Sequence, residues 1–380
     1  MLFLIIFLAI IIPYFASERY KKIALLISFI LLFIPWGMQY EMVQDWSSNL
    51  IRWNAVNHAD TDYYGRNIEP LYVWLMSACK PLTFFGWLML CAFFELSILF
   101  ILITRYMPPK YYWASIFVLM AYHDNGLLLI NSNRQTIALV FTIIGVLFLQ
   151  GDYTFICKKM KINKNIVKYL IAILCFISAI NIHGGAFPSM GIIPLYYLSG
   201  KITKLNKMPI LMVFCSLYLL PRFFDCSFLK DIFFVLLKIS DVKAFEEYAA
   251  DISLGATGSI VSMIFALFII IALSLTYHII PQNIRFFSLC VLAEYVFGGF
   301  FTSNLHRIMQ YYYIYSIIAV PYVFFSLKKS EYKELRNFSR VYCLLAIVLY
   351  THSFYAVVTE QEIYNRWVNF QTIFDAPLWY

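Results

Sequence analysis

Long runs of apolar residues, separated by short polar segments, extend over nearly the whole chain. The runs cover residues 1–16, 23–40, 82–104, 111–129, 134–150, 169–183, 186–200, 208–221, 257–279, 284–302, 307–326 and 341–358. A helix that crosses a bilayer needs about 20 apolar residues, whereas a barrel strand alternates apolar and polar positions over about 10. Because these runs are continuous, the pattern predicts an all-α, polytopic integral membrane protein with about 12 transmembrane helices.

The composition supports this prediction. Hydrophobic residues make up 62% of the 380 positions and charged residues 13%, whereas soluble domains are about 45–50% apolar and about 25% charged. The formal net charge is +8. In a membrane protein, an excess of Lys and Arg is typical of cytoplasmic loops. We therefore expect a lipid bilayer around the chain and no nucleic-acid partner.

Basic residues indicate which loops face the cytoplasm. About 19 of the 29 Lys and Arg residues fall in six segments on alternate sides of consecutive spans: 18–22, 104–110, 157–168, 200–207, 278–285 and 326–340. The positive-inside rule assigns these segments to the cytoplasm, so both termini are predicted outside. The first 16 residues lack a basic leader and are interpreted as a retained span.

The sequence predicts a single transmembrane domain over residues 1–380, with long outside loops at about 41–81 and 222–256. The apolar stretch 71–81 is too short to span the bilayer, so we expect a re-entrant or interfacial helix there. "FLKDIFFVLLKI" in the second loop has the pattern of an amphipathic helix lying in the interface.

Metal and cofactor motifs are missing from the sequence. The eight cysteines are scattered, without a CxxC pair or a Cys/His cluster, which argues against a disulfide framework and a zinc site. P-loop, GxSxG, HExxH and Rossmann patterns are also missing. We therefore expect no metal and no cofactor.

Arg134 lies at the start of an apolar run, within "NSNRQTIALV" (131–140). Ser132 or Asn133 can cap a helix there, which puts Arg134 in the first turn beside free N–H groups. A cation at this end is disfavoured by roughly a few tenths of a kcal/mol. An anion would gain from both the amides and the guanidinium. We expect an anion here, with a snorkelling arginine at the membrane interface as the alternative.

His183 closes another apolar run and is followed by Gly184 and Gly185, which suit a C-terminal cap and a tight turn. A neutral histidine there could accept a proton from a sugar hydroxyl. The alternative is a helix-end histidine that bonds the terminal carbonyls. Two acids, Glu95 and Glu294, fall inside predicted spans as either structural hydrogen-bonding groups or parts of an ion path.

The first outside loop contains "DTDYYGRNIEPLYVWL" (60–75), which mixes carboxylates with Tyr and Trp. Aromatic faces beside polar groups suit a carbohydrate, through ring stacking and hydrogen bonds. An aromatic belt at the membrane interface is the alternative.

Four motifs in order, "ADTDYYGRNIEPLYVWL", "NRQTIALV", "INIHGGAF" and "LHRIMQYYYIY", resemble the EpsG/Wzy-type family of bacterial polysaccharide polymerases. The resemblance covers roughly residues 40–325. It departs from the family pattern at Gly185, where many members carry serine.

The resemblance implies an enzyme at the outer face of the bacterial cytoplasmic (inner) membrane, with a fold similar to the multi-helix lipid-linked glycosyltransferases. Such a polymerase transfers a growing glycan from undecaprenyl diphosphate to a lipid-linked repeat unit, without metal or cofactor. Its partners would be the undecaprenyl-diphosphate-linked oligosaccharide and the bilayer, with a chain-length regulator as a further candidate. O-antigen, capsule and exopolysaccharide all stay open as the product.

This chemistry needs cations for the diphosphate leaving group and a base for the attacking hydroxyl. The candidate catalytic residues are the leading cation, the first-choice base and two alternative bases: Arg134, His183, Asp62 and Glu69. The candidate substrate-binding residues supply further cations, sugar-stacking rings and polar groups on the same predicted side: Arg307, Arg222, Arg66, Tyr63, Tyr64, Trp74, Gln135 and His306.

Two other classes remain as alternatives. A flippase or exporter of lipid-linked glycan would prefer charges along the full depth of the bundle, and here only Glu95 and Glu294 lie deep. A membrane O-acyltransferase modifying a glycan would also use a membrane histidine. Such an enzyme often takes its acyl donor from the cytoplasmic side, whereas His183 is predicted outside.

Overall fold

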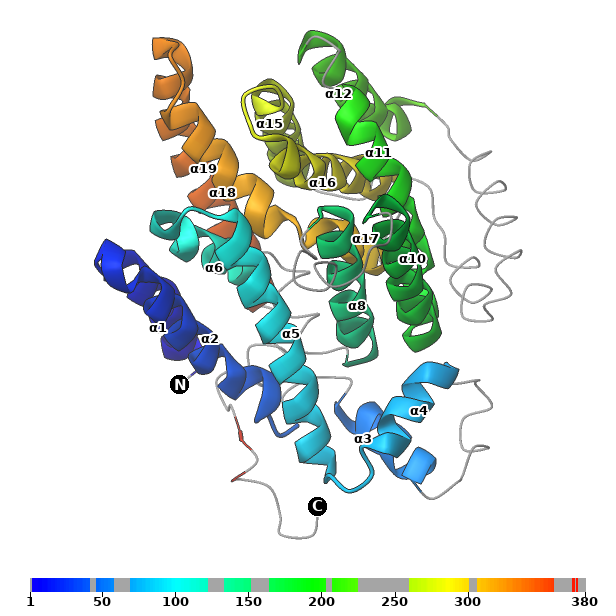
Figure 1. Ribbon diagram of the computed structural model, residues 1–380. Helices are drawn as coiled ribbons and strands as arrows, with labels where there is room; N and C mark the ends of the chain where they lie inside the picture. The colour runs from blue at the N-terminus through cyan, green and yellow to red at the C-terminus, as the bar shows by residue number, and fades with distance from the viewer. Residues whose placement is uncertain are drawn as a thin grey trace. The chain divides into compact units, whose positions relative to one another are not determined.

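The computed structural model describes most of the chain: residues 2–41, 46–57, 69–121, 133–151, 164–202, 207–224, 260–300, 306–358, 371, 372 and 374. Helices dominate these residues, which confirms the all-α class (Figure 1). Within the described residues, extended pairing is limited to an isolated antiparallel bridge between Gln39 and Thr372.

The chain divides into two compact units. The first comprises Met1–Phe187 and Tyr350–Tyr380, and the second comprises Pro188–Leu349. Long helix α19, Lys333–Val358, contributes to both. The single domain expected over residues 1–380 stays a prediction.

In the first unit, apolar helices pack side by side. Helix α1 (Leu2–Phe15) contacts α2 (Lys21–Gly37) and α6 (Tyr112–Ala121), and α2 contacts α5 (Phe84–Tyr106) (Figure 1). The last carbonyls of a helix lack partners within the helix. Buried Lys21 provides such partners for α1, because its Nζ donates to the carbonyls of Pro13 and Tyr14 at 2.8 and 3.0 Å.

Two further helix pairs of this unit position Glu69, Trp74, Arg134, Gln135 and His183. Helix α8 (Asn133–Leu149) packs closely on α10 (Lys164–Ile182), and α3 (Trp46–Asn57) packs on α4 (Pro70–Ala78), which also contacts α10. Gly145 permits the close approach of α8 to α10, because a Cβ there would lie only 3.3 Å from Cys175 Cβ.

In the second unit, helix α16 is surrounded by other helices and is buried almost all round. Such a helix is expected to be hydrophobic on every face. It contacts α11, α12, α17 and α18. The helices of this unit besides α19 are α11 (Ile192–Ile202), α12 (Lys207–Phe223), α15 (Ile260–Thr276), α16 (Gln282–Phe300), α17 (His306–Tyr313) and α18 (Ser316–Lys328).

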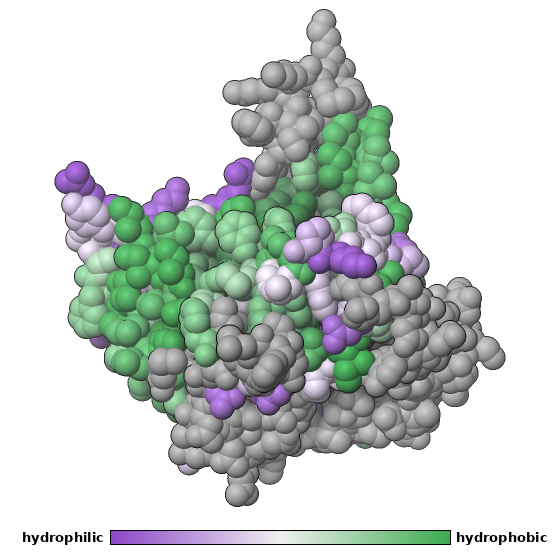
Figure 2. Space-filling view, turned by 90° about the horizontal axis from the view of Figure 1, so that it is seen from below, coloured by the Kyte–Doolittle hydropathy of each residue, from purple (hydrophilic) through white to green (hydrophobic). Residues whose placement is uncertain are grey.

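Two described helical segments, Glu18–Gly37 and Phe84–Tyr106, are long and apolar enough to cross a membrane. Shorter apolar helices are Leu2–Phe15, Asn133–Leu149, Ile166–Ile182, Pro209–Phe223 and Met263–Thr276. Broad apolar patches lie on the surface (Figure 2), and Phe15 is 76% exposed. Soluble monomers rarely expose large apolar patches. The count of about twelve spans and the assignment of sides stay predictions.

Several element boundaries differ from those expected. The span predicted at 307–326 is two helices, α17 and α18, with a break at residues 314–315. The short helix expected at 71–81 is present as α4, whereas α3 was not predicted at all. The amphipathic helix expected within 222–256 lies outside the described residues.

Candidate functional site

Glu69 is the centre of a polar cluster in the first unit. It occupies the N-cap position of α4, and Pro70 begins the helix, as proline's fixed φ favours. The Glu69 carboxylate makes no capping bond to its own helix. It reaches instead to the start of α8 and to the turn that follows α10.

The two carboxylate oxygens of Glu69 join these segments. Arg134 Nη1 donates to Oε2 at 2.7 Å, and the Gly184 backbone N–H donates to Oε1 at 2.9 Å. His183 Nδ1 lies 3.6 Å from the same Oε1, which is longer than a normal hydrogen bond. Arg134 and His183, which are far apart in sequence, thus meet on one side chain.

The turn after α10 gives His183 its position. Helix α10 ends at Ile182 and continues, after His183, into the 3₁₀ helix η4 (Gly184–Gly191). The expected glycine cap takes a different form: neither Gly184 nor Gly185 has a positive φ, and Glu69 accepts the Gly184 N–H. The His183 ring lies over Gly185, where an added Cβ would be 2.6 Å from Nε2.

The charges of the cluster follow from its contacts. Burial alone would raise the pKa of Glu69, but the neighbouring His183, the Arg134 charge and the Gly184 N–H together lower it to about 2. Burial lowers the pKa of His183, and Arg134 and Arg52 add to this effect while Glu69 opposes it. At neutral pH the cluster therefore contains a carboxylate, a guanidinium and a neutral imidazole.

Arg52 is a cation of this region that sequence reasoning missed. It lies on α3, where its Nη1 donates to Asn49 Oδ1 at 3.1 Å, and its charge acts on His183. The sequence placed Arg52 in an outside loop with no expected helix. A pattern analysis had no signal that would bring it near the histidine.

The start of α8 holds two further polar side chains. Asn133 is the first residue of the helix and is only 7% exposed, and its Nδ2 has no hydrogen-bond partner within the described part of the chain. Gln135 is also buried, at 6% exposure. The alternative cap, Ser132, lies outside the described residues. A buried amide without a partner is costly, and a bound ligand or water is one way to satisfy it.

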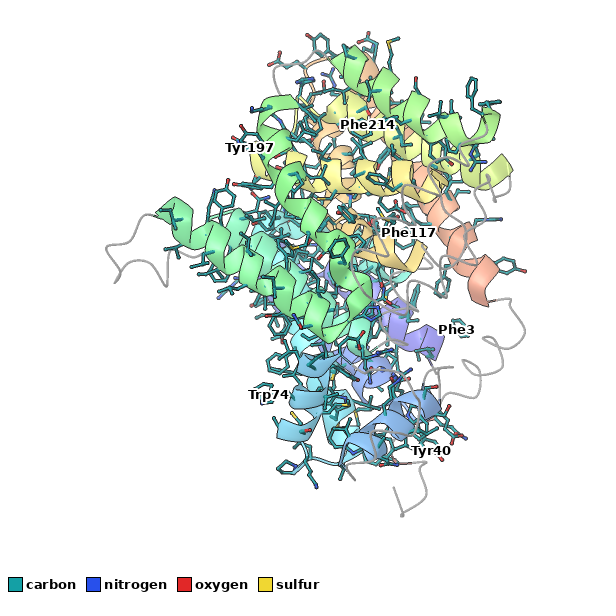
Figure 3. All side chains as sticks on the ribbon, turned by 90° about the vertical axis from the view of Figure 1, so that its right-hand side faces the viewer. Phe3, Tyr40, Trp74, Phe117, Tyr197 and Phe214 are labelled. Atoms are coloured by element: carbon teal, nitrogen blue, oxygen red, sulfur yellow. The ribbon has the colours of Figure 1, made fainter. Side chains whose placement is uncertain are left out.

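The other predicted residues are distributed as follows. Arg222 belongs to the second unit, in the last turn of α12, where its Nη2 donates to Tyr218 Oη at 3.1 Å. Trp74 lies on α4 and is 63% exposed (Figure 3). His306 and Arg307 begin α17, but their side chains are outside the described part. The remaining four also lie outside the described residues: Asp62, Tyr63, Tyr64 and Arg66.

The cluster around Glu69 can bind an anion through Arg134 and accept a proton through His183. Within the part of the chain that the structure describes, no group of three or more His, Cys, Asp or Glu side chains could hold a metal ion.

The fold and the cluster together define a helical membrane protein with a polar site at its helix ends. The sequence profile of the EpsG family matches residues 22–372, so the chain belongs to the EpsG family. This is a Wzy-type polysaccharide polymerase family, which makes the chain a bacterial inner-membrane protein of polysaccharide biosynthesis. No curated protein and no solved structure matches it.

Proposed function

We propose that this polymerase transfers a growing glycan from undecaprenyl diphosphate to the sugar end of a lipid-linked repeat unit, at the outer face of the inner membrane. The observation that carries the proposal is the meeting of Arg134 and His183 on Glu69. The site then contains a cation for a leaving group and a neutral base for a hydroxyl.

Arg134 serves the leaving group. As the bond between the anomeric carbon and the diphosphate oxygen breaks, negative charge grows on the diphosphate and needs fixed positive charge nearby. The Arg134 side chain is 25% exposed, so a ligand can reach it. Arg307, with Arg222 or Arg66, is a candidate to add further positive charge.

His183 serves the attacking hydroxyl. As the acceptor sugar oxygen bonds to the anomeric carbon, its proton passes to the imidazole. Glu69 lies beside Nδ1 and favours the tautomer with the proton on that nitrogen, which leaves Nε2 as the acceptor. With a pKa of about 2, the Glu69 carboxylate is a weak base, so it positions His183 rather than replacing it. Asp62 remains the alternative base.

The remaining roles complete the proposal. Tyr63, Tyr64 and Trp74 stack on sugar rings, and Gln135 and His306 contact the substrate. About twelve spans enclose the site, with both termini outside. A chain-length regulator is a candidate partner.

Replacement of Arg134 by alanine tests the proposal. The variant is expected to lose long glycan chains while single repeat units accumulate on lipid, because the leaving diphosphate has lost its cation. Arg134→Lys keeps the charge but loses the planar fork and should retain partial activity. Arg340→Ala, at an exposed position, is the matched control and should give a normal ladder. A normal ladder from Arg134→Ala would remove the diphosphate role.

A further inference from the structure

The guanidinium of Arg134 is only partly occupied by Glu69. Nη1 donates to Glu69 Oε2, and no hydrogen bond to a described residue engages Nη2 or Nε. The two side chains are 25% and 20% exposed, so the ion pair lies at a surface that a ligand can reach. Arg134 can therefore contact a second anion while Glu69 stays in place.

Glu69, by contrast, has both oxygens in use. Oε2 accepts a hydrogen bond from Arg134. Oε1 accepts one from the Gly184 N–H and lies near His183 Nδ1. The carboxylate thus has two separate effects on the site. It neutralises the cation that a substrate phosphate needs, and it holds the turn that carries His183.

Apart from Glu69, the groups around Arg134 favour the binding of an anion. The start of α8 presents the positive end of the helix dipole. The buried Asn133 amide adds an Nδ2 donor that lacks a partner among the described residues. Arg52 contributes a further positive charge near His183. Glu69 is the carboxylate that interacts directly with Arg134 in this cluster.

We propose that Glu69 is a built-in counter-anion that shares Arg134 with the diphosphate of the substrate, lowering the affinity for diphosphate while holding His183 in position. This inference rests on the proposed function for its substrate class. Like charges repel across the shared guanidinium, so bound diphosphate is held less tightly than Arg134 alone would hold it. Release of the diphosphate product is thereby faster.

The test uses the full chain in detergent and inorganic diphosphate as the probe, with binding measured by calorimetry. Glu69→Gln removes the charge but keeps an oxygen for the Gly184 N–H. It should bind diphosphate at least about fivefold more tightly, the factor that corresponds to 1 kcal/mol, and it should polymerise more slowly. Glu69→Asp keeps the charge and should not tighten binding. Glu18→Gln removes an exposed charge of the same unit and should change neither quantity.

Unchanged or weaker diphosphate binding by Glu69→Gln would overturn the inference, since a purely structural role for Glu69 predicts that Arg134 loses its position. The absence of detectable diphosphate binding to the wild type and to Glu69→Gln also counts against the inference. The binding measurement requires no glycan transfer. If Glu69→Gln binds diphosphate more tightly but the wild type transfers no glycan from a polyprenyl-diphosphate donor, the counter-anion role stands and the proposed function fails.

Discussion

Substitution of Gly185 by alanine tests the position of His183 without altering any polar group of the cluster. The new Cβ would lie 2.6 Å from His183 Nε2, whereas ordinary contact begins at 3.4 Å. The ring must therefore retreat by about 0.8 Å, the difference between these two distances. A misplacement of about 1 Å in a catalytic group can cost roughly 100-fold in rate.

We therefore expect Gly185→Ala to polymerise roughly 100-fold more slowly than the wild type. The assay is the rate of glycan elongation in membranes supplied with purified lipid-linked repeat units. Gly185→Ser should be impaired in the same way, because its Cβ would meet the same His183 ring. This is expected even though the resemblance to the family predicts serine here in many members.

Gly200→Ala is the matched control, since the nearest atom to its added Cβ is 3.8 Å away. It should keep wild-type activity. Both variants should elute from size exclusion as the wild type does, which separates a moved ring from a misfolded protein. Wild-type elongation by Gly185→Ala would refute the placement of His183 at the reacting hydroxyl.

Four further outcomes are expected. His183→Ala should abolish polymerisation in membranes with purified substrate, and retained polymerisation would remove His183 as the base. Because burial keeps the pKa of His183 below its usual value, the wild-type rate should hold down to about pH 6.5 and fall only at more acidic pH, where the imidazole gains a proton. In Glu69→Gln this acidic fall should move to still lower pH, since the carboxylate that raises the pKa of His183 is gone. An Asp62→Cys protein should react with an impermeant maleimide on intact cells above the background of the eight native cysteines; reaction only after permeabilisation would invert the predicted topology.

The apolar runs alone predicted the all-α class, but they did not predict helix α3 of the first unit. Helix α3 lies in a stretch of the first outside loop that is too polar for a span, although Trp46, Leu50 and Trp53 are spaced to share one helix face. Its Trp53 stacks on Trp87 of α5 with ring centroids 5.9 Å apart, and Trp46 meets Phe84 at 5.5 Å. These contacts join distant parts of the chain, and this packing stabilises α3 against α5.

The candidate site was partly visible in the sequence. The unusual place of Arg134 and the glycines after His183 marked both residues, and the structure describes them on one carboxylate. Glu69 was expected as an alternative base, because residue type gave no distances. The Gly184 N–H could not be anticipated either, since a backbone donor leaves no trace in side-chain chemistry.

Reconstitution of the purified chain in liposomes with polyprenyl-diphosphate-linked repeat units tests the central claim most directly. The account predicts a ladder of lengthening glycans and release of polyprenyl diphosphate in step with each new linkage, without metal or nucleotide sugar. Movement of the lipid-linked unit across the bilayer without elongation, or elongation only when a nucleotide sugar is added, would contradict it.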